Sequence, residues 1–227
     1  METVRRILEI ACFAADGLAL LGIPVSLYLH SQFKQKGKRS KLPAVLGIVL
    51  ILLALVMNIG YFLIAVKTYQ GQASHMEELP SFTVTSENLH DGTWDDSISN
   101  TDAGENKSPQ LSWEAVAGAK AYGILMIDPD GSNWLHWKTP SVTQTALPLG
   151  FADAESYVGP YPPEGQTHTY TIYVVAMKAP KTDVMGALDC PNDEDIPTLL
   201  RSFDIGGDGK PGNALAVGTL TGTYTRP

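Results

Sequence analysis

The chain has 227 residues, a hydrophobic fraction of 44% and a formal net charge of −8. Residues 1–75 carry eight Lys and Arg against three Asp and Glu, whereas residues 76–227 carry eight against twenty-one, so the two parts have net charges of +5 and −13. The acidic C-terminal part argues against a nucleic-acid partner, which needs clustered Lys and Arg, and against a surface that lies flat on anionic lipid.

Two long apolar runs open the chain, at residues 7–29 and 43–66. Both reach the roughly 20 residues that an α-helix needs to cross a hydrocarbon core about 30 Å thick. Glu9 and Asp16 interrupt the first run, whereas Asn58 is the only strongly polar side chain in the second. The pattern predicts a transmembrane α-helical hairpin, with an interfacial or core helix as the alternative for the first run.

The loop between the runs, residues 30–42, is basic, with four Lys and one Arg. Positively charged loops stay on the cytoplasmic side, and these five charges outweigh the two arginines near the N-terminus. We therefore expect a multi-pass protein of the cell membrane, with residues 1–67 as the hairpin and both termini and the C-terminal domain extracytoplasmic. Cleavage near residues 71–73 is the alternative, but the apolar run exceeds the roughly 7–15 residues of a signal-peptide core.

Asp16 and Asn58 stand at matching depths in the two runs. At about 1.5 Å per helical residue, both lie about 21–22 Å from the basic loop. Because an acid in lipid usually faces a polar partner, the sequence predicts a hydrogen bond between them. A contact of Asp16 with another subunit or with a small water defect is the alternative.

Beyond residue 80 the chain is typical of an antiparallel, β-sandwich-like domain with one or two short helices, spanning residues 80–227. The expected strands lie at residues 82–85, 111–116, 121–128, 134–139, 169–177 and 214–225. Residues 195–203 form the one expected helix, with an acidic start and Pro197 in the first turn. Residues 68–79 are polar and without periodicity, which predicts a linker that acts as a tether.

The two cysteines give no framework for the fold. Cys12 lies in the first apolar run and Cys190 among acidic residues of the C-terminal part. We expect one in lipid and the other outside it, so neither a disulfide nor a Cys-based zinc site is expected.

Two segments concentrate the residues that can carry chemistry. In the first, an apolar strand ends in Asp128 and Asp130 around a proline, and His136 follows between two tryptophans. In the second, a Gly- and Pro-rich stretch leads into His168 and Tyr170, which point to the same face of a strand about 7 Å apart. Two imidazoles and a phenol can donate to one oxyanion, while carboxylates orient the imidazoles.

At these residues the chain resembles the phosphatidylethanolamine-binding protein family, and more closely its bacterial Raf-kinase-inhibitor-like branch. The motifs that carry the resemblance are Asp128-Pro129-Asp130 with Trp134-x-His136-Trp137, and Gly159-Pro160-x-Pro162-Pro163-x-Gly165-x-x-His168-x-Tyr170. Supporting matches are Phe82–Ser86 with Asp91-Gly92, Asn106–Trp113 and Leu220–Arg226. Together they cover residues 80–227 in the expected order, and the two-span anchor lies outside the resemblance.

The resemblance implies antiparallel sheets and a small pocket for phosphate, a phospholipid head group or a phosphorylated side chain. The pocket residues that it implies are Asp128, Asp130, His136, Gly159, Pro160, His168 and Tyr170. Three positions depart from the family pattern. Thr169 stands where Arg or Lys is common, Gly131 follows the Asp-Pro-Asp run, and residues 206–212 replace a frequent helix.

Other roles for these residues stay open. The histidines can be structural, and the two acids can cap a turn at the strand end. A zinc site is possible in principle, but no HExxH-type spacing places two ligands on one element, so we expect no metal and no cofactor. Trp113, Trp134 and Trp137 are expected in the core rather than as a platform for a ligand.

An enzyme would need groups that the sequence does not offer plainly. No Gly-x-Ser-x-Gly elbow is present, and the acidic surroundings of Cys190 disfavour its thiolate. Two acids and two histidines could still run acid–base hydrolysis of a phosphoester. We predict a membrane-anchored binding module, not an enzyme, that holds a small anionic ligand or lipid head group. The alternatives are an inhibitor or interaction module for a partner protein and a phosphoester hydrolase.

Overall fold

The computed structural model describes residues 16–17, 20, 24–32, 34 and 42–227. They fall into two units, residues 1–71 and residues 72–227. Most of the first predicted span (residues 7–29) and of the basic loop (residues 30–42) lies outside the described residues. The two-span hairpin as a whole therefore stays a prediction.

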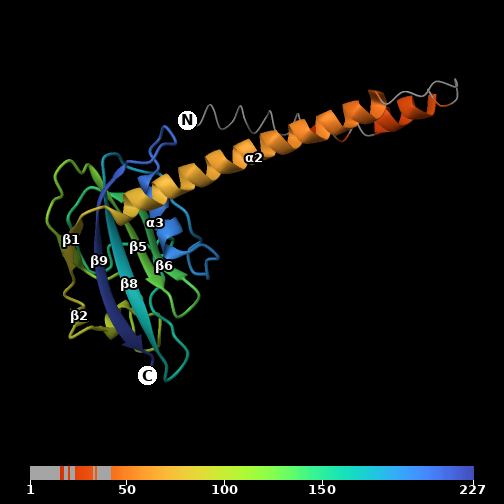
Figure 1. The fold of residues 1–227 in the computed structure, drawn as a ribbon. Coiled ribbons are helices and arrows are strands. Elements are labelled where there is room, and N and C mark those ends of the chain that lie inside the picture. The colour runs from red at the N-terminus through yellow and green to blue at the C-terminus, as the bar shows by residue number, and fades with distance from the viewer. Residues whose placement is uncertain (1–15, 18–19, 21–23, 33, 35–41) are drawn as a thin grey trace. The chain divides into compact units, whose positions relative to one another are not determined.

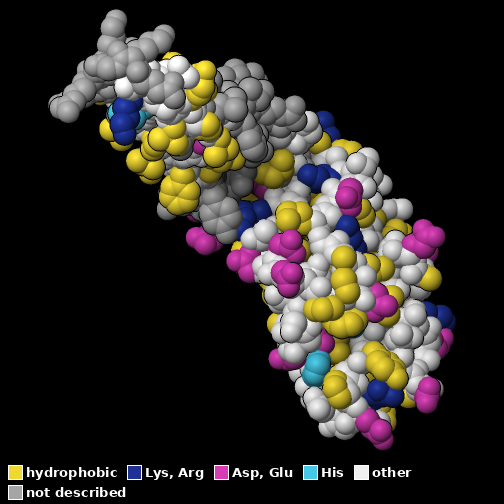
Figure 2. Space-filling view, turned by 90° about the vertical axis from the view of Figure 1, so that its right-hand side faces the viewer, with side chains coloured by type: hydrophobic (Ala, Val, Ile, Leu, Met, Phe, Trp, Pro, Cys, Tyr) yellow, Lys and Arg dark blue, Asp and Glu magenta, His cyan; other side chains and the backbone are white. Residues whose placement is uncertain are grey.

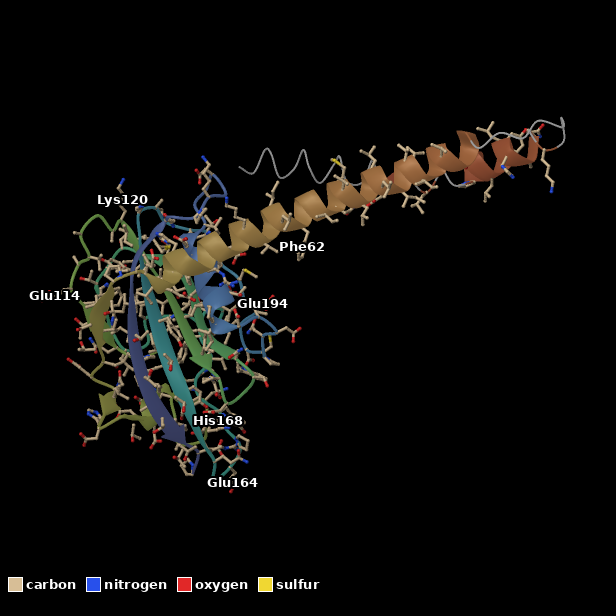
Figure 3. The ribbon with its side chains drawn as sticks, viewed as in Figure 1. Phe62, Glu114, Lys120, Glu164, His168 and Glu194 are labelled. Atoms are coloured by element: carbon tan, nitrogen blue, oxygen red, sulfur yellow. The ribbon has the colours of Figure 1, made fainter. Side chains whose placement is uncertain are left out.

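The second apolar run forms helix α2, Leu42–Glu77 (Figure 1). Its proline lies in the first helical turn, where a missing N–H costs no helical hydrogen bond. Within the described part of the chain, the segment Gly47–Lys67 is the one helix long and apolar enough to cross a membrane. Its large side chains are mostly exposed, as Phe62 illustrates (Figure 3), and hydrophobic side chains gather on the described part of this unit (Figure 2). Length and composition are thus those of a membrane span.

The predicted contact between the two apolar runs is confirmed. The Asn58 Nδ2–H₂ group donates to Asp16 Oδ1 at 2.9 Å and to the Ala54 carbonyl at 3.0 Å. A Cβ atom placed on Gly47 would lie 3.3 Å from Ser26 Oγ. The contacts 16–58 and 26–47 run in opposite directions along the chain, so the described part of the first run lies antiparallel to α2.

The predicted tether at residues 68–79 is helical up to Glu77. These residues include Gln, Ala, Met and Glu, which favour helix, and no proline before Pro80. Because a residue before proline avoids helical backbone, Pro80 limits the helix. Met76 and Leu79 then pack on a core cluster of the second unit.

The second unit is mainly β, with nine strands in one curled sheet (Figure 1). The strands are β1 (Ser81–Thr85), β2 (Leu89–His90), β3 (Thr93–Trp94), β4 (Leu111–Trp113), β5 (Ala121–Asp128), β6 (Trp134–Val142), β7 (Ala146–Leu147), β8 (Thr167–Met177) and β9 (Ala214–Thr225). The sheet order is β6-β5-β8-β9-β1-β4-β7, with β2 and β3 beside β9. A sandwich of two separate sheets is not confirmed, because β1 pairs with both β9 and β4 and so joins the strands into one path.

The remaining elements are a short 3₁₀ helix η1 (Asp96–Ile98) and helix α3 (Ile196–Asp204). The α3 position matches the sequence prediction, because the Asp195 side chain caps the helix by accepting from the Thr198 N–H and Pro197 occupies its first turn. Strand β6 extends past Pro140, which is tolerated because β6 is an edge strand.

Strand β5 is buried along all eight residues, because apolar clusters cover both of its faces. One cluster includes Ile124 and Trp137, and the other includes Leu125 and Phe203, which belongs to α3. Gly123 is required there, since a Cβ atom would lie 2.0 Å from the Phe203 ring. Asp128 is the last residue of this buried strand and lies at the end of the sheet.

Candidate functional site

A cavity of about 460 Å³ opens at the end of the sheet where β5 stops and β6 and β8 begin. Its walls come from these strands and from four loops. The lining residues are Asn100, Asp128, Gly131, Ser132, Trp134, His136, Val158, Gly159, Tyr161, Pro163, His168, Asp189 and Pro191. Figure 3 shows His168 near the start of β8, close to the turn that carries Glu164.

Strand register explains why residues far apart in sequence meet here. Asp128 lies opposite Trp134 in the β5–β6 pair, and Ile127 lies opposite Thr171 in the β5–β8 pair. The end of β5 is therefore flanked by the beginnings of β6 and β8. The predicted pair His136 and His168 reaches one cavity from two different strands.

One wall of the cavity is a buried carboxylate–imidazole pair. The Asp128 side chain is only 5% exposed; its Oδ2 accepts from His168 Nδ1–H at 2.7 Å and its Oδ1 from the Gly131 N–H at 2.9 Å. Because a carboxylate only accepts, Nδ1 of His168 carries the proton. Protonation of Nε2 would then give this imidazole a second N–H donor and a positive charge.

The opposite wall holds His136 in a different environment. Its Nδ1–H donates to the Val158 carbonyl at 2.8 Å, and its side chain is nearly buried. Burial lowers the pKa of His136 below its ordinary value, against the weaker raising effects of the Val158 and Gly159 carbonyls and of Asp128 and Asp189. At neutral pH the imidazole is therefore neutral, and its Nε2 is an acceptor.

Tyr170 does not line the cavity, contrary to the prediction from the family resemblance. Its side chain is fully buried, and its ring meets that of His136 edge-on at a centroid distance of 5.1 Å. Burial raises the pKa of Tyr170, with a further contribution from the Asp128 carboxylate. Its hydroxyl lies near Asp128 and the Tyr161 N–H without a hydrogen bond of good geometry to either. Tyr170 thus supports His136 from behind.

Asp130 and Pro160 also lie outside the cavity lining. Asp130 is exposed, and its Oδ2 accepts from the Thr169 N–H at 2.7 Å, so it holds the turn after β5 against β8. The buried Pro160 accepts from the Asn100 N–H at 3.0 Å through its carbonyl. Both residues shape the walls rather than face a ligand.

Gly159 does line the cavity and has a strict packing role. Its N–H donates to Asn106 Oδ1 at 2.7 Å, and a Cβ atom would lie 2.0 Å from the Ile98 carbonyl oxygen. Only glycine permits this close approach of two backbone segments. The Gly-Pro motif therefore positions the loop against η1.

Several lining residues were not predicted as site residues. Tyr161 and Pro163 belong to the second motif, so the family pattern could have included them. Trp134 was expected in the core, where Trp113 and Trp137 indeed lie, but it is only partly buried at the cavity. Asn100, Asp189 and Pro191 carry no local signal, because tertiary contacts alone bring them to the cavity.

No group of three or more His, Cys, Asp and Glu side chains that could hold a metal is present among the residues that the structure describes. Arg226 stacks its guanidinium 4.0 Å over the Tyr161 ring, at the rim but outside the lining. The arrangement places two imidazole rings and two carboxylates beside apolar surface.

Comparison with known proteins gives the family. The profile of the family described as phosphatidylethanolamine-binding protein matches residues 72–225. The UPF0098 proteins YbhB and YbcL of Escherichia coli are 34% and 30% identical over 105 and 106 residues; each match covers 36% of this chain and 66% and 58% of the relatives. The chain thus spans less than two thirds of the length of each of these two relatives. A UPF0098 protein of Methanothermobacter thermautotrophicus is 30% identical over 115 residues, covering 38% of this chain and 76% of that protein.

Two solved structures are similar over 65% of this chain and 99% of their own. They are E. coli YbcL, described as a new member of the mammalian PEBP family, at 24% identity and a TM-score of 0.49, and the homologue CT736 of Chlamydia trachomatis, at 22% and 0.46. The family profile covers more than half of the chain. This chain therefore belongs to the phosphatidylethanolamine-binding protein family.

Proposed function

We propose that this chain is a membrane-anchored, extracytoplasmic binding module that holds a phosphate-like anionic group in the cavity between His136 and His168. The group could belong to a phospholipid head group, a phosphorylated ligand or another acidic ligand. The observation that carries the proposal is the meeting of two imidazoles at one cavity, each with its Nδ1–H held by a fixed acceptor.

The fixed acceptors orient both imidazoles before a ligand arrives. The Asp128–His168 bond is 2.7 Å long and that of His136 to the Val158 carbonyl is 2.8 Å. A preorganised group loses little side-chain entropy on binding, which favours affinity. Protonation of His168 adds the charge-assisted N–H bond that oxyanions accept most strongly.

The size of the cavity favours an organic ligand over a bare anion. Its volume of about 460 Å³ lies within the roughly 300–1,000 Å³ that is typical of small-molecule pockets. Trp134, Tyr161 and Pro163 supply apolar surface next to the histidines. A ligand with an anionic head and an apolar neighbouring group matches this lining.

Phosphate binding tests the proposal directly. Isothermal titration of the full chain in phosphate-free detergent, at pH 6 with inorganic phosphate, should give saturable binding with one site. His168→Ala should weaken it by about tenfold or more, since it removes a charge-assisted donor. His90→Ala is the matched control, because His90 is exposed and does not line the cavity. Equal binding by both variants would place the anion elsewhere, and turnover of a phosphoester that depends on His168 would favour a hydrolase.

The apolar segment Gly47–Lys67 and the basic residues before it support the proposed anchor. In a variant without native cysteines, single cysteines can replace Ser40 in the basic loop and Thr182 in the domain. A membrane-impermeant maleimide should label Thr182→Cys in intact cells and Ser40→Cys only after permeabilisation. The reverse pattern would overturn the proposed orientation.

A further inference from the structure

A second carboxylate, that of Asp189, lines the cavity on the side opposite β8. The loop that carries it docks on the outer edge of β6: the Asp189 N–H donates to the Leu135 carbonyl at 2.8 Å, and the Leu135 N–H donates to the Cys190 carbonyl at 3.2 Å. Residues 189–190 thus continue the hydrogen-bonding pattern of the sheet beyond its edge strand. The Asp189 backbone has φ +57°, a conformation that Asp and Asn tolerate better than most residues.

Buried side chains hold this loop in place. Asn192 is 8% exposed; its Oδ1 accepts from the Ala187 N–H at 2.8 Å, and its Nδ2–H₂ group donates to three carbonyls between 3.1 and 3.3 Å. Lys138 donates to the Gly186 carbonyl at 2.9 Å from the neighbouring strand. The Asp189 carboxylate itself accepts from Trp134 Nε1–H at 3.3 Å. Its position at the cavity is therefore built into the fold.

The charge inventory of the lining is unusual for an anion site. Among the lining residues, Asp128 and Asp189 are carboxylates, His136 and His168 are imidazoles, and none is Lys or Arg. His136 is neutral at neutral pH, as its environment requires. An entering anion therefore meets two carboxylates and at most one charged imidazole.

We propose that Asp189 sets the charge class of the ligand, so that the cavity takes singly charged oxyanions, such as phosphodiesters, and disfavours the dianion of a phosphomonoester. This inference rests on the proposed function. The Coulomb repulsion between a fixed carboxylate and a ligand is proportional to the charge of the ligand. At the same place, the repulsion free energy between Asp189 and a dianion is therefore twice that between Asp189 and a monoanion.

The test compares two ligands of similar size and different charge. Dimethyl phosphate carries one negative charge at every working pH, and methyl phosphate carries about two at pH 8, since its second pKa is about 6. Both are titrated calorimetrically into the full chain in phosphate-free detergent at pH 8. Asp189→Asn keeps an acceptor for Trp134 and a residue suited to the positive φ. Asp193→Asn is the matched control, because Asp193 is exposed in the same loop, does not line the cavity and gives the same change in net charge.

The native chain should bind dimethyl phosphate more tightly than methyl phosphate. Asp189→Asn should strengthen dimethyl phosphate binding by about threefold and methyl phosphate binding by about tenfold, because the factor for the dianion is the square of that for the monoanion. Asp193→Asn should change both by less than about twofold, since its exposed charge is screened. Independently of any ligand, Asp189→Asn should lower the pKa of His136 in an NMR titration, because the Asp189 carboxylate raises it.

Each of three results would overturn the inference. The first is an equal gain in affinity for the two ligands in Asp189→Asn, the second is an equal effect of Asp189→Asn and Asp193→Asn, and the third is tighter binding of methyl phosphate than of dimethyl phosphate by the native chain. In those cases binding that is lost in His168→Ala would leave the proposed function standing. If the native chain binds neither ligand, at pH 8 or at pH 6, the proposed function itself is wrong and the inference falls with it.

Discussion

The two walls of the cavity hold the same side chain in two environments. On the β8 wall, His168 donates to a carboxylate that is itself nearly buried. On the β6 wall, His136 donates to a neutral carbonyl, and burial lowers its pKa. A carboxylate partner and a neutral carbonyl partner give the two rings different electrostatic surroundings. The comparison teaches that the partner of Nδ1, rather than the residue type, sets the surroundings of each histidine.

Removing the carboxylate from the β8 wall should have the largest effect. Asp128→Ala leaves His168 Nδ1 and the Gly131 N–H without their acceptor at a position where the native carboxylate is nearly buried. We expect a loss of about 2–4 kcal/mol in the free energy of unfolding and at least a tenfold loss of phosphate affinity. Tryptophan fluorescence during denaturation measures the first quantity, because all four tryptophans lie in residues 72–227. Asp130→Ala, which alters an exposed carboxylate, is the control and should cost less.

Stability should respond to pH through the β6 wall. The folded-state pKa of His136 lies below the ordinary value of an unfolded imidazole, about 6.5, so on acidification the unfolded chain takes up this proton first. This part of the stability is therefore present above about pH 6.5 and is lost as the pH falls below it, by about 1.4 kcal/mol for each unit of separation. Melting curves between pH 7.5 and 5 should be steeper in pH for the native chain than for His136→Gln. Identical slopes would mean that His136 charges freely in the fold.

The smallest effect is expected behind the β6 wall. Tyr170→Phe removes a buried hydroxyl that has no hydrogen bond of good geometry, so stability should be unchanged or slightly higher. Phosphate affinity should change by less than about twofold, because Tyr170 does not line the cavity. A tenfold loss of affinity would restore Tyr170 as a direct ligand contact.

Regular patterns in the sequence predicted much of the second unit. The apolar runs of β5 and β9 and the capped start of α3 carry local signals, and they form where expected. The single sheet could not be predicted, because it depends on the parallel pairing of β1 with β9, more than 130 residues away along the chain.

The candidate site divides in the same way. The two motifs correctly predicted that Asp128, His136 and His168 meet at one cavity. Strand register is the structural reason that they do. Alternation placed Tyr170 on the same side of β8 as His168, but the burial of its ring against His136 depends on packing between strands, which the local sequence does not show. The position of Asp189 at the cavity could not be predicted. It depends on backbone hydrogen bonds between residues 189–190 and Leu135, and such bonds leave no signature in the sequence.

Histidine NMR provides the most direct test of an anion held between the two walls. The full chain with ¹⁵N-labelled histidine has five imidazoles, at positions 30, 75, 90, 136 and 168. On titration with dimethyl phosphate at pH 6, the ring signals of His136 and His168 should move together with one dissociation constant, while that of His90 stays in place. Movement of His90 alone, or unchanged signals from His136 and His168 at saturating ligand, would contradict the account.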